Sequence, residues 1–127
     1  MSLRLMLDEN ISYVIAEQAR LKHPQILIDS VHTWREGAFM SEPDDLLLAA
    51  LHTEAWTLVT YDRKMLSERP YLFDGTVSHS GVLFMDKRTV APYDIGGLVL
   101  ALCDFWLAHQ NDDWNGRIAY LKKPRRK

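Results

Sequence analysis

The chain has 127 residues and a net charge of -2 at pH 7, and 47% of its residues are hydrophobic. This length suits a single domain with one core, and the charge excludes a uniformly basic nucleic-acid-binding protein. No apolar stretch reaches the roughly 20 residues that a membrane-spanning helix needs, so we expect no membrane association. The single cysteine excludes an internal disulfide, and no signal peptide is visible, so we expect a cytoplasmic protein.

The charges are unevenly distributed along the chain. Five cations lie in the last six residues: Lys122, Lys123, Arg125, Arg126 and Lys127. Without them the net charge falls from -2 to -7. We therefore predict one acidic domain over residues 1–121 and a basic C-terminal tail over residues 122–127. Such a tail can bind the phosphates of a nucleic acid, although a merely solubilising terminus carries the same charge.

Short apolar runs alternate with amphipathic segments throughout the chain. In chain order they predict a strand over 3–7, a helix over 11–22, a strand over 26–31, a helix over 44–55, strands over 57–60 and 81–86, a helix over 94–109 and an edge strand over 117–121. The segments between them are rich in turn residues and indicate loops. This alternation predicts an α/β fold with a mostly parallel sheet and helices on both faces.

Carboxylates follow two of the predicted strands. Asp8 comes directly after the first strand, and Asp62 comes shortly after the strand over 57–60. The carboxyl ends of parallel strands meet at one edge of a sheet, so these acids converge if the two strands are neighbours. Asp44 begins the helix that leads into the second of these strands, which puts it at the same edge. A structural alternative is that Asp8 caps a helix and Asp44 complements a helix dipole.

Three carboxylates that lie close together raise one another's pKa, and a divalent cation relieves their repulsion. Oxygen ligands without cysteine or histidine favour Mg²⁺ or Mn²⁺, and such ions are suited to phosphodiester hydrolysis. We therefore predict that Asp8, Asp44 and Asp62 are metal ligands and catalytic residues. The predicted supporting residues, which can bond a ligand carboxylate or a water, are Glu9, Asn10 and Thr60.

Three segments carry a family resemblance: LDENIS at 7–12, PDDLLLAAL at 43–51 and TLVTYDRKM at 57–65. They resemble the PIN-like domains of the DUF5615 type, which are related to the PIN-domain ribonucleases and include toxins of bacterial toxin–antitoxin pairs. The resemblance covers about residues 3–66. It implies a three-layer α/β/α sandwich and Mg²⁺- or Mn²⁺-dependent RNA cleavage, with the family's acids at Asp8, Asp44 and Asp62 and its threonine at Thr60. It also implies an antitoxin partner.

Two features depart from the family pattern. Lys64 stands where many relatives carry a further acid, and the chain from Pro92 onward lies outside the resemblance. Lys64 favours an alternative in which the domain is a catalytically degenerate PIN-like module that binds RNA or a protein partner. A phosphoacceptor domain is another alternative, with Asp62 as the acceptor. The helix over 94–109 is apolar around most of its circumference, which suits burial or a homodimer contact.

Overall fold

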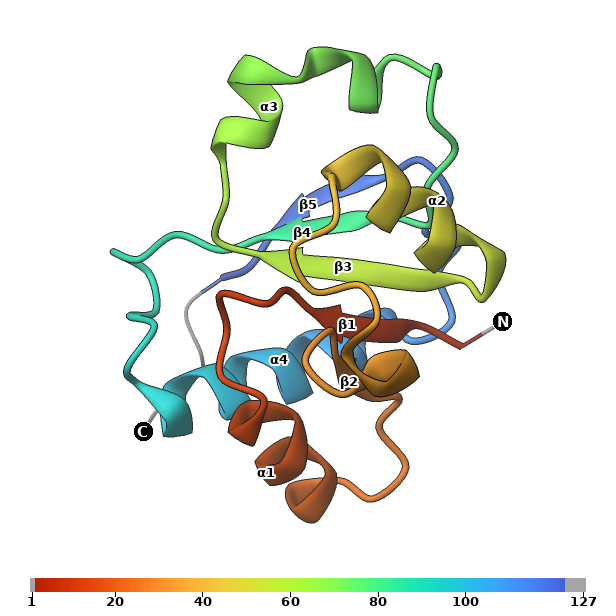
Figure 1. Ribbon diagram of the computed structural model, residues 1–127. Helices are drawn as coiled ribbons and strands as arrows, with labels where there is room; N and C mark the ends of the chain where they lie inside the picture. Colours follow the sequence, from red (N-terminus) through yellow and green to blue (C-terminus); the bar gives the residue numbers. More distant parts are fainter. Residues whose placement is uncertain (1, 123–127) are drawn as a thin grey trace.

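The computed structural model describes residues 2–122, which form a five-stranded sheet in the order β2-β1-β3-β4-β5 (Figure 1). The strands are β1 (Arg4–Leu7), β2 (Ile28–Ser30), β3 (Trp56–Thr60), β4 (Val82–Phe84) and β5 (Ile118–Tyr120). Every neighbouring pair is parallel. The predicted strands are therefore confirmed, including the edge strand near the C-terminus.

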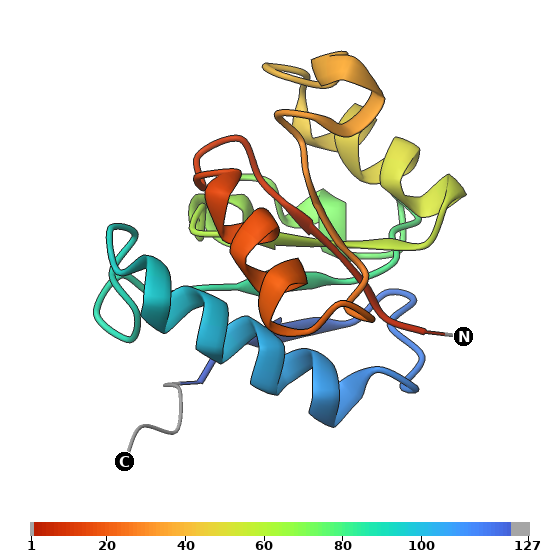
Figure 2. The same ribbon diagram turned by 90° about the horizontal axis from the view of Figure 1, so that it is seen from below.

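Helices cover both faces of the sheet, which confirms the three-layer α/β/α arrangement. The α-helices are α1 (Val14–Lys22), α2 (Asp44–Thr53), α3 (Lys64–Glu68) and α4 (Ile95–His109), and two 3-10 helices are η1 (Trp34–Gly37) and η2 (Pro70–Phe73). Figure 2 shows α1 and α4 side by side on one face. The other face carries α2 and α3 (Figure 1).

Alternate side chains of the strands divide the interior into two cores. Leu5 and Leu7 of β1 pack with α1 and α4, whereas Met6 between them packs with α2. All three side chains have no exposed surface, as expected for a parallel sheet that is buried on both faces. On the first side, the indole Nε1 of Trp106 in α4 donates to the carbonyl of Leu3 at 2.8 Å and fixes the helix across β1.

Helix α1 begins three residues later than the sequence pattern predicts. The amide of Ile11 donates to the carbonyl of Asp8 at 3.0 Å, so a turn follows β1 and holds the chain before the helix starts. The hydroxyl of Ser12 then accepts from the amide of Val14 at 3.3 Å. This turn keeps Asp8 and the next two residues outside the helix, where their side chains lie at the edge of the sheet.

Gly81 joins the irregular segment before β4 to the strand and has a positive φ of 98°. A Cβ atom at this position would lie 2.8 Å from the carbonyl oxygen of Trp114. Both the backbone angle and the close approach require glycine. This close approach holds the chain before β5 against the start of β4.

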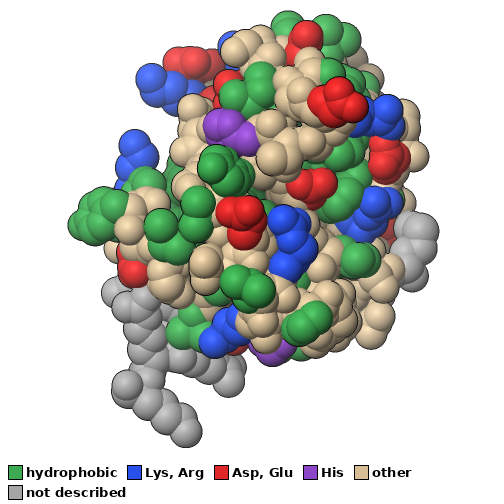
Figure 3. Space-filling model, turned by 60° about the horizontal axis from the view of Figure 1, so that its bottom comes forward, with side chains coloured by type: hydrophobic (Ala, Val, Ile, Leu, Met, Phe, Trp, Pro, Cys, Tyr) green, Lys and Arg blue, Asp and Glu red, His purple; other side chains and the backbone are tan. Residues whose placement is uncertain are grey.

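The outer surface of the α1 and α4 layer carries charges of both signs. Figure 3 shows acidic and basic side chains interspersed with apolar ones over this face. None of the helices within residues 2–122 is long and apolar enough to cross a membrane.

Candidate active site

The neighbouring position of β1 and β3 brings the predicted acids to one edge of the sheet. Leu7 is in register with Val59, and the amide of Asp8 continues the ladder by donating to the carbonyl of Val59 at 2.9 Å. Asp62 lies two residues beyond the end of β3, and α2 begins at Asp44 on the same side. These carboxyl ends lie on the left in Figure 1. The order β1-β3, on which the predicted convergence depended, is therefore observed.

Asp8 is the most enclosed of the three acids, with a relative exposure of 8%. Its Oδ1 accepts from the amide of Glu9 at 2.8 Å, and its Oδ2 accepts from the hydroxyl of Thr60 at 2.7 Å. A buried carboxylate needs such donors, because leaving it without them would incur its desolvation cost. The two bonds fix the orientation of the carboxylate at the end of β1.

Thr60 joins two of the acids. Its side chain is fully buried, and its hydroxyl donates to Asp8 while accepting from the backbone amide of Asp62 at 3.0 Å. One hydroxyl therefore sets both the side chain that ends β1 and the backbone turn that follows β3. Thr60, which the sequence predicted as a supporting residue, thus contacts the residues that follow both strands.

Asp44 lies in the first turn of α2, where a carboxylate is stabilised by the helix dipole. Its Oδ2 forms an ion pair with the guanidinium of Arg69. Arg69 follows α3, 25 residues along the chain from Asp44. This arginine is a site residue that the sequence did not reveal, because no motif links it to Asp44. Its guanidinium supplies Asp44 with a positive charge from within the protein.

Burial and mutual repulsion act on the acids together. The pKa of Asp8 is raised, first by desolvation and further by the negative charges of Asp44 and Glu9, although the bonds from Thr60 and Glu9 oppose this. The pKa of Asp44 is also raised by desolvation and by the charges of Asp62 and Asp45, against the lowering effect of Arg69. Asp44 therefore interacts electrostatically with both other acids, as expected for carboxylates that share a site.

Asp62 and Lys64 lie in the turn that leads into α3. The Oδ1 of Asp62 accepts from the backbone amide of Lys64 at 3.2 Å, so the carboxylate supports the start of this short helix. Within residues 2–122 the ammonium of Lys64 forms no ion pair. Among the described residues, Arg69 is the cation that forms an ion pair with one of the three acids.

Glu9 braces the loop that leads to α2. Its Oε1 accepts from the amide of Ser41 at 2.8 Å, and its carbonyl oxygen lies 2.6 Å from Nε2 of His32. Ser41 has a left-handed backbone with φ of 62°. Glu9 thus positions the segment before Asp44. The side chain of Asn10 is exposed to solvent beside it.

A fourth carboxylate, Asp86, follows β4 at the same edge but has its own partners. Arg63 and Arg88 contact its Oδ2 at 3.2 Å and 3.1 Å. Hydrogen bonds from Arg88 lead the causes that lower the pKa of Asp86. Asp86 is therefore neutralised locally, in contrast to the raised pKa values of Asp8 and Asp44.

The three acids have the ligand atoms that a divalent ion prefers, but their side chains are not close enough together to hold one. All their donor atoms are carboxylate oxygens, as Mg²⁺ and Mn²⁺ prefer, and their mutual repulsion is the cost that such a cation offsets. In the described part of the chain, however, no three acidic, histidine or cysteine side chains are close enough together to hold a metal. The carboxylate of Asp44 instead forms an ion pair with Arg69.

No protein-family model, curated protein or solved structure matches this chain.

The predicted basic tail has five cations, and of these Lys122 alone lies within the described residues. The other four, Lys123, Arg125, Arg126 and Lys127, lie outside them.

The raised pKa of Asp8 predicts a pH-dependent stability difference. A carboxyl whose pKa is higher in the folded protein stabilises the fold fully below its ordinary value of 3.8. That contribution is lost as the pH rises through the higher folded value. Thermal melting without metal between pH about 4 and about 7 should therefore show Asp8→Asn gaining stability relative to the wild type as the pH rises. A difference that stays constant over this range would contradict the buried charge at Asp8.

Proposed function

We propose that the protein is an Mg²⁺- or Mn²⁺-dependent ribonuclease that cleaves single-stranded RNA at Asp8, Asp44 and Asp62. The observation that carries this proposal is the placement of these acids at one sheet edge, where burial chiefly, and their negative charges further, raise the pKa values of Asp8 and Asp44. Ligands of open parallel sheets bind at this edge. The resemblance of the surrounding motifs to PIN-like domains supports the same chemistry.

The residues of the chain have separate tasks in this proposal. Asp8, Asp44 and Asp62 would hold the ion, and Thr60 would keep Asp8 oriented through its bond of 2.7 Å. Outer contacts of this kind strengthen a metal site because they fix its ligands. Once bound, the ion would activate the attacking water and neutralise charge on the phosphate.

The direct test of the proposal is incubation of the wild-type protein with labelled single-stranded RNA and Mn²⁺. We expect cleavage with Mn²⁺ or Mg²⁺ and none with a chelator. Uncleaved RNA under both metal conditions would favour the alternative function, a degenerate PIN-like module that binds RNA or a protein partner. The ion pair between Asp44 and Arg69 favours that alternative, because it satisfies Asp44 without a metal.

Arg69→Ala tests whether this ion pair opposes metal binding at Asp44. If the guanidinium competes with a metal for Asp44, its removal should tighten Mn²⁺ binding by about two- to fivefold, the range expected from half-exposed ion pairs. Calorimetric titration measures this change. Arg35→Ala is the matched control, because Arg35 is also half exposed and pairs with Glu54 at the opposite end of α2. Equal affinities in all three proteins would show that Arg69 does not oppose metal binding.

The proposed partners are RNA and, by resemblance, an antitoxin protein, with the chain acting as the toxin of such a pair in the cytoplasm. A homodimer is a further proposal. It is supported by the edge strand β5, where Ile118 and Tyr120 are 37% and 52% exposed.

A further inference from the structure

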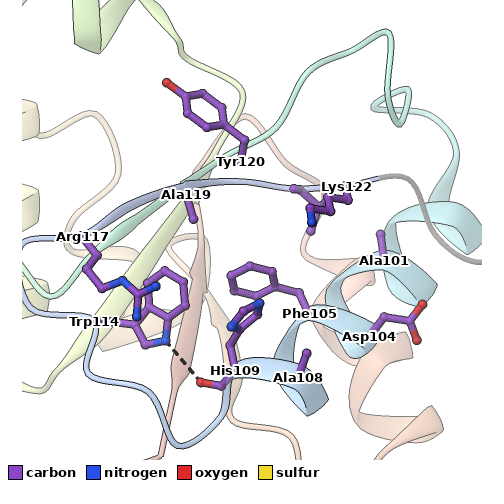
Figure 4. A pocket seen from close by; sticks show the side chains of 11 residues that line it. Ala101, Asp104, Phe105, Ala108, His109, Trp114, Arg117, Ala119, Tyr120 and Lys122 are labelled. Atoms are coloured by element: carbon purple, nitrogen blue, oxygen red, sulfur yellow. Dashed lines mark hydrogen bonds between the residues drawn. The ribbon is translucent and has the colours of Figure 1, made fainter.

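A hollow of about 400 Å³ lies between the second half of α4 and β5 (Figure 4). Its volume is within the range of small-ligand pockets, roughly 300–1,000 Å³. Ala101 and Ala108 of α4 and Ala119 of β5 contribute small side chains to its wall. Figure 4 shows Tyr120 on the opposite side of β5, where its ring packs against Phe84. The hollow therefore opens on the α4 side, away from the α2 layer.

Three rings line the hollow, and their planes are tilted by 41° to 90° relative to one another. The ring centroid of Phe105 lies 4.6 Å from that of His109 and 5.3 Å from that of Trp114. Arg117 places its guanidinium 4.3 Å from the Trp114 ring, so that it covers this indole. In Figure 4 the rings of Phe105 and His109 occupy the middle of the hollow. Planar rings beside a stacked guanidinium are the surface on which nucleic-acid bases stack.

The charged groups around these rings suit a phosphate-bearing ligand. Figure 4 shows Arg117 and Lys122 at opposite ends of the hollow, near the two ends of β5. Of the acids nearby, Asp112 lies 2.8 Å from Nδ1 of His109 and 3.9 Å from the guanidinium of Arg117, and the carboxylate of Asp104 points away from the rings. Arg117 is half exposed despite this pair, and Lys122 forms no ion pair within residues 2–122. Both cations can therefore contact a ligand that carries negative charge on either side of an aromatic group.

Further cations follow Lys122 in the sequence. Lys122 is the first of five cations within six residues, and the rest of that segment lies outside the described residues. A single phosphate needs one or two cations, whereas a run of five matches several successive phosphates. A chain of nucleotides therefore fits these charges better than a free nucleotide does.

We propose that the hollow between α4 and β5 binds one base of a single-stranded RNA chain, with the base stacking on the ring of Phe105 beside His109 and with Arg117 and Lys122 contacting the adjoining phosphates. This site lies outside the three acids. The inference deepens the proposed function, because it states where the RNA is held, but it concerns binding alone. Its test therefore excludes metal ions and does not require cleavage.

The test measures the affinity of a short fluorescent oligouridylate by anisotropy in the presence of a chelator. Ala108→Phe fills the hollow from an exposed helical position and should weaken binding by about tenfold, the loss expected when one stacked base is excluded. Leu107→Phe is its control, since Leu107 is exposed on the same helix but does not line the hollow.

Charge reversal gives a second, independent readout. Lys122→Glu should weaken binding and reduce the slope of log affinity against log salt by roughly 0.7 for each phosphate that the protein no longer neutralises. Lys22→Glu, with the same charge change at the end of α1, should alter the slope less.

Four results would overturn the inference. The first is unchanged RNA affinity in Ala108→Phe. The second is displacement of the oligouridylate by UMP at equal concentration, which would indicate a free-nucleotide site. The third is equal displacement by inorganic phosphate, which would show that the rings take no part. The fourth is a change in self-association with Ala108→Phe, without a change in RNA affinity, which would make the hollow an interface between copies. If the wild type binds RNA in this way but does not cleave it with Mn²⁺, the ribonuclease proposal fails and the binding site stands.

Discussion

Replacing Asp8, Asp44 or Asp62 with asparagine is expected to reduce Mn²⁺-dependent RNA cleavage by more than about 100-fold in each case. Removing an outer hydrogen bond to a metal ligand already costs roughly 10–100-fold, so removing a ligand itself should cost more. The three acids interact through their charges, with Asp44 coupled to both others. They should therefore act as a unit, and double variants should lose little more activity than single ones.

Two further carboxylates provide matched controls for these variants. Asp86 also follows a strand at the same edge, but Arg63 and Arg88 neutralise it. Asp45 stands beside Asp44 in the first turn of α2. Asp86→Asn and Asp45→Asn should retain cleavage within a few-fold of the wild type. If Asp44→Asn cleaves as well as Asp45→Asn does, Asp44 is a helix-start residue only.

Thr60→Val is expected to lower cleavage and Mn²⁺ affinity by roughly 10–100-fold, although Thr60 touches neither the metal nor the RNA in our proposal. Valine keeps the shape of the side chain but removes the hydroxyl that donates to Asp8 and accepts from the amide of Asp62. Cleavage kinetics and a Mn²⁺ titration measure the two losses. Thr60→Ser restores the hydroxyl and should recover most of both.

Thr57→Val distinguishes this positioning role from a general loss of stability. Thr57 is a buried threonine of the same strand, and its hydroxyl donates to the carbonyl of Ser80 at 2.7 Å. Both valine variants remove a buried hydrogen bond, at a cost of about 1–3 kcal/mol in the free energy of unfolding. Thermal melting should therefore show comparable losses, whereas cleavage should fall only in Thr60→Val. A similar fall in both would assign the effect to the fold.

The sequence predicted those parts of the fold that depend on local patterns. The apolar runs that end at Asp8, Asp62 and Asp86 are short and buried on both faces, so the apolar runs in the sequence were enough to predict these strands. The placement of Asp44 followed from the antiparallel direction of its helix. The order of β1 and β3 was a condition of the prediction rather than its result, because strand order depends on long-range packing.

Contacts between distant loops could not be predicted. Arg69 lies between α3 and η2 and pairs with Asp44 at the start of α2. The path of this irregular segment leaves no periodic pattern in the sequence from which the contact could be predicted. Similarly, Glu9 accepts a hydrogen bond from the amide of Ser41, and this serine has a left-handed backbone conformation that serine rarely adopts. The hollow beside β5 depends on how far α4 extends over the sheet, which is a property of packing.

The proposed metal site is best tested by a calorimetric titration of Mn²⁺ into the wild-type protein, Asp44→Asn and Asp45→Asn at neutral pH. It examines metal binding apart from RNA and from catalysis. We expect saturable binding of Mn²⁺ to the wild type and to Asp45→Asn, and a loss of that binding in Asp44→Asn. Indistinguishable titrations of the wild type and Asp44→Asn, or no binding heat in any of the three proteins, would contradict the account.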